Sequence, residues 1–203
     1  MNSDTPVVFV VDDDEAVRDS LQMLLESVDL RCETYASATE FLDGHNPDQH
    51  SCLVADIRMP GMSGLDLQEA LNKRASTIPI LFITGHGDVP MAVDAMKSGA
   101  LDFIQKPFRD QDLLDRIHQA LERDQEHRED NRAVADIRDR IARLTARERE
   151  VMERVVKGQA NKVIALDLGV SQRTVEIHRA RVMQKMRARS LAELVRMIGR
   201  IGA

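Results

Sequence analysis

The sequence contains no tryptophan, one tyrosine and two cysteines among 203 residues. Cys32 and Cys52 do not have the spacing of metal ligands and give no reason to expect a disulfide framework, so a reducing, cytoplasmic environment fits best. With so few aromatic side chains there is little surface on which single-stranded nucleic acids could stack. No apolar run approaches the roughly 20 residues needed to cross a bilayer, and the first residues, MNSDTP, do not resemble a signal peptide. We therefore expect a soluble, intracellular protein without a membrane partner.

The charges are divided unevenly along the chain. Residues 1–137 contain 12 Lys and Arg against 27 Asp and Glu, a net charge of −15, whereas residues 138–203 contain 16 against 7, a net charge of +9. A chain of this length is compatible with two domains. The sequence thus predicts an acidic module followed by a small basic one, and a basic module of this size most often meets the phosphate backbone of a nucleic acid.

Strand-like apolar runs alternate with amphipathic stretches between residue 7 and about residue 122. The predicted strands cover residues 7–11, 31–35, 52–56, 78–84 and 102–105, and the predicted helices cover residues 15–28, 37–42, 64–74, 89–98 and 110–121. This alternation predicts right-handed βαβ crossovers and a parallel sheet with helices on both faces.

Polar side chains stand at the carboxyl ends of four of these strands. Asp12 and Asp13 follow the first strand, and the other three ends carry Asp56, Thr84 and Lys106. An acidic triplet such as residues 12–14 is, by itself, most often a helix start. The carboxyl ends of parallel strands, however, converge at one edge of a sheet, where ligands bind. The set predicts a functional site there, with Asp14 left as the acidic residue that starts the helix.

The residue types suggest phosphoryl chemistry. Asp56 can attack phosphorus and form an aspartyl phosphate, with Mg²⁺ offsetting the repulsion between the carboxylate and the phosphoryl group. Asp12 and Asp13 offer the hard oxygen ligands that Mg²⁺ prefers. Lys106 can pair with Asp56 before transfer and with a phosphate oxygen afterwards. The Thr84 hydroxyl can bind another oxygen.

Four segments, VVDDDE, DIRMPGMSGLDL, ITGHGDVPMAVDAMKSGALDFI and KPF, resemble the receiver domain of bacterial two-component response regulators over residues 5–122. The resemblance implies a doubly wound, five-stranded, flavodoxin-like parallel sheet and a sensor histidine kinase that supplies the phosphoryl group to Asp56. It implies Mg²⁺ bound by Asp13, Asp56 and the backbone carbonyl of Arg58, with Asp12 acting through water. Such a domain accepts a phosphoryl group and is not an enzyme beyond slow self-dephosphorylation.

The resemblance also assigns switch residues. Phe103 falls where receivers carry an aromatic side chain that turns inward when Thr84 moves toward the phosphate, although an ordinary core strand residue would also fit this position. A cis Lys106–Pro107 bond is implied too, and an X-Pro bond tolerates that isomer. His86, in the loop after Thr84, is expected to be an exposed residue rather than a catalyst.

The basic module contains predicted helices at residues 145–157, 161–168, 172–186 and 191–198. A capping box of Thr145 and Glu148 opens the first helix, while Asn161 and Ser171 are expected to cap the second and third. Two short helices joined by a turn with Gly169, the second rich in cations, are typical of a helix-turn-helix. The fourth helix could pair two DNA-binding modules or pack under the third.

One face of the third helix should enter the major groove of DNA. Val175, Val182 and Met186 share the opposite, buried face. The segment LTAREREVMERVVKGQANKVIALDLGVSQRTVEIHRARVMQKM resembles the LuxR/NarL-type helix-turn-helix, and the whole chain looks like the FixJ branch of that family. Combining spacing and resemblance, the predicted contacts to double-stranded DNA are Lys162, Ser171, Arg173, Thr174, Glu176, Ile177, His178, Arg179 and Lys185.

We therefore expect a receiver domain over residues 1–122, a charged linker over 123–142 and a DNA-binding domain over 143–203. The linker could be flexible, but Val134, Ile137, Ile141 and Leu144 recur at helical spacing and favour a helix.

The predicted function is a phosphorylation-controlled transcription activator. Phosphorylation of Asp56 would change the surface between residues 89 and 108, drive formation of a homodimer through the fourth helix and fifth strand, and promote promoter binding with RNA polymerase as a partner. Two alternatives are a constitutive DNA-binding protein with a receiver-like dimerisation module and a Mg²⁺-dependent phosphohydrolase.

Overall fold

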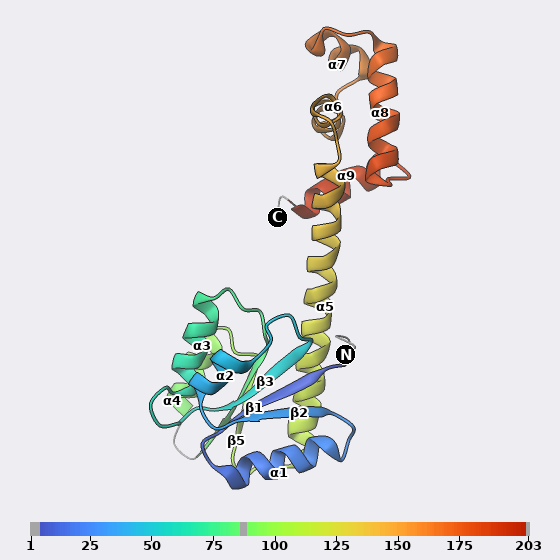
Figure 1. The fold of residues 1–203 in the computed structure, drawn as a ribbon. Helices are drawn as coiled ribbons and strands as arrows, with labels where there is room; N and C mark the ends of the chain where they lie inside the picture. The colour runs from blue at the N-terminus through green and yellow to red at the C-terminus, as the bar shows by residue number, and fades with distance from the viewer. Residues whose placement is uncertain (1–4, 86–88, 202–203) are drawn as a thin grey trace. The chain divides into compact units, whose positions relative to one another are not determined.

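The computed structural model describes residues 5–85 and 89–201, so His86 lies outside the described residues. The chain divides into two compact units, Met1–Arg128 and Glu129–Ala203 (Figure 1). Within the described residues, no helix combines the length and apolar character that a membrane span requires.

The first unit is built on a five-stranded parallel sheet with strand order β2-β1-β3-β4-β5. The strands are β1 Val7–Val11, β2 Arg31–Tyr35, β3 Ser51–Asp56, β4 Ile80–Thr84 and β5 Asp102–Gln105. All five residues of β1 are buried because helices cover both faces of the sheet. The predicted doubly wound parallel sheet is confirmed. Strand β4 begins two residues later than predicted, directly after Pro79, whose ring nitrogen cannot donate to the ladder.

Five helices surround the sheet: α1 Glu15–Glu26, α2 Ala38–Gly44, α3 Gly64–Lys73, α4 Val89–Lys97 and α5 Asp110–Ala142. Side chains that alternate along β1 point to opposite faces. Phe9 packs in a cluster with residues of α2, α3 and α4, and Val10 packs in a second cluster with residues of α1 and α5. This division places α2–α4 on one face and α1 and α5 on the other.

Helix α5 is one continuous helix that extends to Ala142, through the segment for which a flexible linker and a helix were both considered. In the first unit it is fixed by Asp124, which is 1% exposed. The Asp124 carboxylate accepts hydrogen bonds from His50 Nδ1 at 2.9 Å, from the backbone N–H of Ser51 at 3.0 Å and from Arg128 Nε at 2.6 Å. These contacts hold the helix against the amino-terminal edge of the sheet as far as Arg128.

The second unit contains the end of α5 and four further helices: α6 Ala146–Val156, α7 Asn161–Leu168, α8 Gln172–Met186 and α9 Leu191–Ile201. They share one apolar core, which includes Val151, Ile164, Val175, Val182 and Leu194. The predicted small all-helical domain is confirmed.

Three of the predicted helix boundaries in this unit depend on local caps that the structure contains. Thr145 and Glu148 form the capping box at the start of α6, Ser171 accepts a hydrogen bond from the Thr174 N–H at the start of α8, and Gly169 ends α7 in a left-handed conformation.

The expected Asn161 cap was wrong. The residue before α7 is Ala160, which makes no side-chain cap, and Asn161 is already helical. The Asn161 Oδ1 atom instead accepts a hydrogen bond from Arg179 Nη1 at 3.1 Å, so a contact with α8 has replaced the local one.

Candidate functional site

The carboxyl ends of β1, β3 and β5 bring Asp12, Asp56 and Lys106 together. Lys106 Nζ lies 3.1 Å from Asp12 Oδ2 and 3.3 Å from Asp56 Oδ1. The parallel pairing of β1 with β3 sets the two carboxylates at the same edge. The chain after β5 is positioned by a hydrogen bond from the Lys106 N–H to the Thr84 carbonyl oxygen at 2.7 Å and by a cis Lys106–Pro107 bond. Three of the five side chains predicted at strand ends, those of Asp12, Asp56 and Lys106, therefore meet.

The acidic triplet after β1 separates into three different environments. Asp12 is 3% exposed, and its Oδ1 atom accepts a hydrogen bond from the Asp14 N–H at 2.9 Å. Asp13 is exposed to solvent. Asp14 caps α1 by accepting a hydrogen bond from the Ala16 N–H at 2.9 Å, as the sequence predicted for a helix start. Only the first two acids are available to a ligand at the sheet edge.

Asp56 is half-buried and held on one side by the backbone. Its Oδ2 atom accepts a hydrogen bond from the Arg58 N–H at 2.9 Å, while its Oδ1 atom faces Lys106. Burial raises the pKa of Asp56, and the neighbouring Asp12 charge adds to this rise, which outweighs the opposing effect of Lys106. A carboxylate with a raised pKa is more basic and hence a better nucleophile when ionised.

Lys106 shows the complementary effect. Burial by itself lowers the pKa of the ammonium, but the hydrogen bond and charge of Asp12, followed by the charge of Asp56, outweigh burial and raise it. Lys106 therefore stays protonated at neutral pH and supplies the positive charge that two close carboxylates need.

Thr84 ends β4 beside this group. It is 3% exposed, and its hydroxyl donates a hydrogen bond to the Gly85 carbonyl oxygen at 3.3 Å. Phe103 on β5 is partly buried against the cluster formed by α2–α4. On α4, Val93 and Met96 are 46% and 40% exposed, so apolar side chains stand on the surface next to β5.

Gly64 is a site residue that the sequence reasoning treated only as a helix start. A Cβ atom at this position would lie 2.3 Å from the Asp56 carbonyl oxygen and 2.9 Å from the Phe82 ring. Its N–H donates to the Ile57 carbonyl oxygen at 2.9 Å. Because only glycine permits this approach, Gly64 lets α3 begin directly against the backbone of the candidate acceptor. A glycine directly after a capping serine, Ser63, was the available signal.

The donor set fits a hard divalent cation by its chemistry. The carboxylates of Asp12, Asp13 and Asp56 and the carbonyl of Arg58 are the oxygen ligands that Mg²⁺ prefers. In residues 5–85 and 89–201, no three Asp, Glu, His or Cys side chains are arranged as a metal site. The Lys106 ammonium instead compensates the two closest carboxylates.

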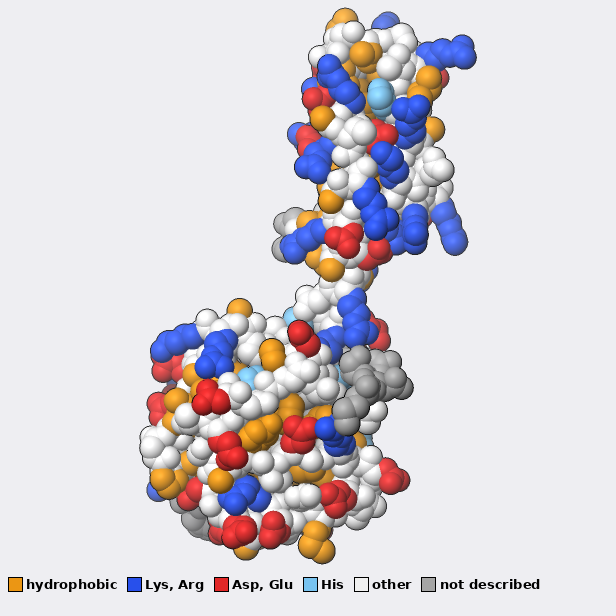
Figure 2. All heavy atoms as spheres, viewed as in Figure 1, with side chains coloured by type: hydrophobic (Ala, Val, Ile, Leu, Met, Phe, Trp, Pro, Cys, Tyr) orange, Lys and Arg blue, Asp and Glu red, His pale blue; other side chains and the backbone are white. Residues whose placement is uncertain are grey.

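In the second unit, α8 has the faces that the sequence predicts. Val175, Val182 and Met186 are buried, whereas Arg173, Glu176 and Ile177 are exposed, Ile177 to 47%. Figure 2 shows Lys and Arg side chains gathered along this unit on the visible face. The exposed face of α8 thus carries a cation, an acid and an apolar side chain that take no part in the core.

Four predicted DNA contacts already have roles within the second unit. Ser171 and Thr174 form the start of α8, with their hydroxyl oxygens 2.8 Å apart. Arg179 binds Asn161, as described above. Lys185 Nζ lies 2.6 Å from the Oε2 atom of Glu148 and donates to the Arg143 carbonyl oxygen at 3.2 Å.

Two further residues predicted to contact DNA, Lys162 and His178, differ in their exposure to solvent. The Lys162 side chain is exposed near the start of α7. His178 is partly buried, and its Nδ1 atom has no hydrogen-bond partner among the described residues.

Glu148 is the buried partner in the Lys185 pair. It is 2% exposed and also accepts a hydrogen bond from the Thr145 N–H at 2.8 Å. The hydrogen bond from Lys185, followed by that from Thr145, lowers the pKa of Glu148. In this structure Lys185 therefore joins α8 to the start of α6.

Comparison with known protein families gives two matches in this chain. Residues 8–118 match the family described as response regulator receiver domain, and residues 142–198 match the family described as bacterial regulatory proteins, luxR family. Receiver domains generally bind Mg²⁺ for phosphorylation.

Similar proteins extend over nearly the whole chain. Nodulation protein W of Bradyrhizobium diazoefficiens is 52% identical over 97% of this chain and 86% of its own length. The transcriptional regulatory protein FixJ of Azorhizobium caulinodans is 51% identical over 94% of this chain and 90% of its own length. Among solved structures, the response regulator StyR has a TM-score of 0.87 with 47% identity, covering 96% of this chain and 98% of that one.

A solved full-length FixJ from B. japonicum has a TM-score of 0.59 with 44% identity, covering 97% of both chains. The similarity to these relatives extends over both parts of the chain that match a family. The chain belongs to the FixJ-type response regulators, the two-component transcription regulators in which a receiver domain is joined to a LuxR-type DNA-binding domain.

Proposed function

We propose that a sensor histidine kinase phosphorylates Asp56 and that this modification switches the protein into a DNA-binding, transcription-activating dimer. The observation that carries the proposal is the position of Lys106, whose Nζ atom lies within 3.3 Å of both Asp12 and Asp56. Burial raises the pKa of the Asp56 carboxyl, and Asp56 stands at the sheet edge where α/β proteins bind ligands.

The transfer step uses the two oxygens of Asp56 differently. The Arg58 N–H holds Oδ2, so Oδ1 attacks the phosphorus, and the bond between phosphorus and the kinase imidazole nitrogen breaks as the O–P bond forms. The leaving imidazole keeps the electron pair of that bond and takes up a proton. Lys106 then moves from the carboxylate oxygen to a phosphoryl oxygen, and the Thr84 hydroxyl binds another.

A divalent cation belongs to this proposal. Asp13, Asp56 and the Arg58 carbonyl would hold Mg²⁺, with Asp12 acting through water, and the cation would compensate charge between the attacking carboxylate and the phosphoryl group. The residues fit it by donor chemistry, as shown above. Lys106 leaves Asp12 when it binds the phosphoryl group, and the Asp12 carboxylate would then be available to the cation site.

The response is carried to the surface by Thr84 and Phe103. When the Thr84 hydroxyl leaves the Gly85 carbonyl for the phosphoryl group, it vacates space into which the Phe103 ring turns. The surface of α4 and β5 then changes, and Val93 and Met96 become buried between two receivers. A dimer places two α8 helices on adjacent half-sites of double-stranded DNA, with the predicted contact residues at the groove and RNA polymerase recruited beside it.

The decisive variant is Asp56→Asn, with Asp43→Asn as a matched exposed control on α2. The account expects wild-type protein and the control to accept a phosphoryl group from acetyl phosphate and to bind promoter DNA at least about tenfold more tightly afterwards. Asp56→Asn should show neither effect in a gel-shift titration.

Other outcomes identify the rival functions. Equal DNA affinities with and without phosphorylation would favour a constitutive DNA-binding protein with a receiver-like dimerisation module. Repeated turnover of small phosphate esters would favour a phosphohydrolase, whereas slow loss of phosphate from Asp56 alone is compatible with the proposal.

A further inference from the structure

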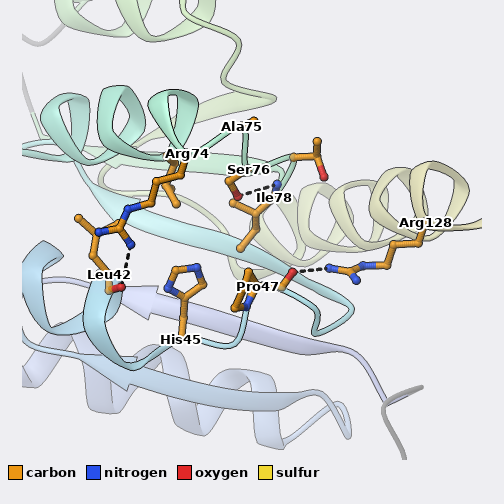
Figure 3. Close-up of a pocket in the computed structure, with 10 residues that line it drawn as sticks. Leu42, His45, Pro47, Arg74, Ala75, Ser76, Ile78 and Arg128 are labelled. Atoms are coloured by element: carbon orange, nitrogen blue, oxygen red, sulfur yellow. Dashed lines mark hydrogen bonds between the residues drawn. The ribbon is translucent and has the colours of Figure 1, made fainter. Parts of the chain in front are cut away.

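A cavity of about 340 Å³ opens in the first unit, away from the site around Asp56 (Figure 3). It lies between the end of α2, the end of α3, the loops that follow them and Arg128 of α5. Strands β3 and β4 run from this edge toward Asp56 and Thr84, so the cavity is at the amino-terminal edge of the sheet. A six-residue strand spans roughly 17 Å. The cavity is therefore a separate place on the receiver.

The lining combines cations, hydroxyl groups and an apolar floor. The residues are Leu42, His45, Pro47, Leu71, Arg74, Ala75, Ser76, Thr77, Ile78 and Arg128. None is acidic, although the chain up to residue 137 carries a net charge of −15. An acid-free, cation-lined cavity in such a domain favours an anion over any other charged ligand.

Arg128 is not available as the anion ligand. Its Nε atom binds the Asp124 carboxylate at 2.6 Å, and its terminal nitrogens donate to the carbonyl oxygens of Pro47 and Asp48 at 3.2 and 2.8 Å. The charge of Arg128 is therefore compensated and its position fixed. It forms a wall of the cavity that belongs to α5.

Arg74 is in the opposite situation. Its Nη1 atom donates to the Leu42 carbonyl oxygen at 3.0 Å, and it makes no ion pair with any residue that the structure describes. A guanidinium group carries five N–H donors, so most remain for a ligand. Figure 3 shows this side chain reaching from the end of α3 toward Leu42.

His45 supplies a second polar group beside Arg74. Its Nδ1 atom lies 2.8 Å from the Phe41 carbonyl oxygen, and its ring stacks on the Phe41 ring with centroids 4.3 Å apart. Because a carbonyl oxygen can only accept, Nδ1 carries the hydrogen, and Nε2 of the neutral ring is an acceptor that does not donate to an anion. The imidazole is thus held in place as part of the cavity wall, and the hydrogen bonds to an anion come from Arg74.

We propose that this cavity binds a small organic anion, with a single carboxylate on an apolar body. The planar fork of Arg74 matches a carboxylate in a bidentate contact. Leu42, Leu71 and Ile78 cover the apolar body. The volume is at the lower end of the range for small-molecule sites, which limits the ligand to a compact body. This inference does not depend on phosphorylation of Asp56.

The test is a calorimetric titration of the full chain with 4-methylpentanoate. The expected Kd is about 1 mM or tighter. The neutral 4-methylpentanamide and inorganic phosphate should each bind at least about tenfold more weakly, since one lacks the charge and the other the apolar body. In the variant Arg74→Gln, the Kd for 4-methylpentanoate should rise at least about tenfold.

The matched control is Lys73→Gln, which removes the same charge one residue away. Lys73 pairs with Glu69 on the outer side of α3 and does not line the cavity. The Kd of the Lys73→Gln variant for 4-methylpentanoate should stay within about twofold of the wild-type value. Arg74→Lys keeps the charge but loses the planar fork of N–H donors, so its affinity for 4-methylpentanoate should fall at least about threefold. This variant replaces Arg74→Gln in the test if Arg74→Gln does not fold.

Several results would overturn the proposal. One is that 4-methylpentanoate does not bind at about 10 mM. Another is that the Arg74→Gln and Lys73→Gln variants bind it with equal affinity. A third is that 4-methylpentanamide or inorganic phosphate binds as tightly as 4-methylpentanoate. Amide chemical shifts should change at residues 42–46 and 74–78, and changes confined to other residues would place the ligand elsewhere.

Discussion

Each of the two domains contains a lysine paired with a buried carboxylate, and the two pairs differ in what surrounds them. Lys106 faces two carboxylates, Asp12 and Asp56, whose side chains are 4% and 14% exposed. Lys185 faces one, Glu148, whose side chain is 3% exposed and which also accepts hydrogen bonds from Thr145. In the receiver, two carboxylates share the ammonium of Lys106, whereas in the DNA-binding domain one carboxylate has the ammonium of Lys185 to itself.

The pKa directions follow from this difference. In the receiver, burial and the second carboxylate raise the pKa of Asp56 despite Lys106. In the DNA-binding domain, the hydrogen bonds to Lys185 and Thr145 lower the pKa of Glu148. A carboxylate whose charge is fully compensated stabilises the fold, and one whose charge is only partly compensated is available for chemistry. The comparison therefore distinguishes a structural pair from a reactive one.

The largest effect is expected from replacing each of the two lysines by methionine in a separate variant. Lys106→Met should abolish the gain in DNA affinity on phosphorylation, which is at least about tenfold in the wild type, because the ammonium that binds the phosphoryl oxygen is lost. Lys185→Met should keep that gain. Fluorescence anisotropy with a promoter fragment, before and after treatment with acetyl phosphate, measures both. Equal losses in the two variants would contradict the distinction.

A second prediction concerns the backbone around the reactive pair. Gly64→Ala should destabilise the receiver by about 3 kcal/mol, because the added Cβ would lie 2.3 Å from the Asp56 carbonyl oxygen. In the DNA-binding domain, Gly199→Ala meets nothing within 4 Å and should stabilise α9 by about 0.5–1 kcal/mol. Urea denaturation followed by circular dichroism gives both values. A tolerated alanine at position 64 would show that α3 does not need this close approach.

A third prediction isolates the structural pair. Lys185→Met leaves Glu148 buried without its ammonium, but with the Thr145 contacts intact, so the expected loss of stability is about 1–2 kcal/mol. The exposed control Lys157→Met should change stability by less than about 0.5 kcal/mol. Matching stabilities in urea for the two variants would remove the structural role assigned to Lys185.

The smallest expected effect is on the pH dependence of stability, which should have opposite signs for Asp56 and Glu148. The pKa of Asp56 is raised on folding, so its favourable contribution is present at low pH and is lost as pH rises through the folded pKa. Asp56→Asn should therefore raise the Tm at neutral pH, which corresponds to a gain of less than about 1 kcal/mol in the free energy of unfolding. In acid the substitution should change the Tm little. Calorimetry on the receiver transition measures this. A lowered Tm at neutral pH would mean that Lys106 fully compensates Asp56.

Glu148 should behave in the opposite way. Its pKa is lowered on folding, so its contribution is present above the unfolded pKa and is lost as pH falls through the folded value. Glu148→Gln should lower the Tm at neutral pH, with the loss shrinking in acid. If both glutamine and asparagine variants shifted the Tm in the same direction at neutral pH, the two carboxylates would not differ as described.

The sequence predicted the parts of this structure that depend on neighbouring residues. Fully apolar runs such as Val7–Val11 identify strands buried on both faces, and the polar residues that follow them converge because parallel strands share an edge. The caps at Asp14, Thr145 and Ser171 depend on side chains within three residues of the N–H groups they bind. Local patterns of this kind are sufficient for the fold and for the group around Asp56.

Contacts between distant residues were not predictable in the same way. The Lys185–Glu148 pair joins positions 37 apart, and the bond between Arg179 and Asn161 joins positions 18 apart. Helical periodicity gave Lys185 an outward side, but its long side chain folds back to a buried carboxylate. The close approach of Gly64 to Asp56 likewise depends on how α3 packs on β3, and the glycine after the capping Ser63 is only a local sign of it.

The most direct test of the account measures the modification and the response in one sample. Full-length protein is treated with acetyl phosphate and Mg²⁺, the modified residue is located by peptide mass spectrometry, and DNA affinity is measured by anisotropy on the same preparation. The account predicts a phosphoryl group on Asp56 and tighter DNA binding in proportion to its occupancy. A phosphoryl group on another residue, or full occupancy of Asp56 with unchanged DNA affinity, would contradict it.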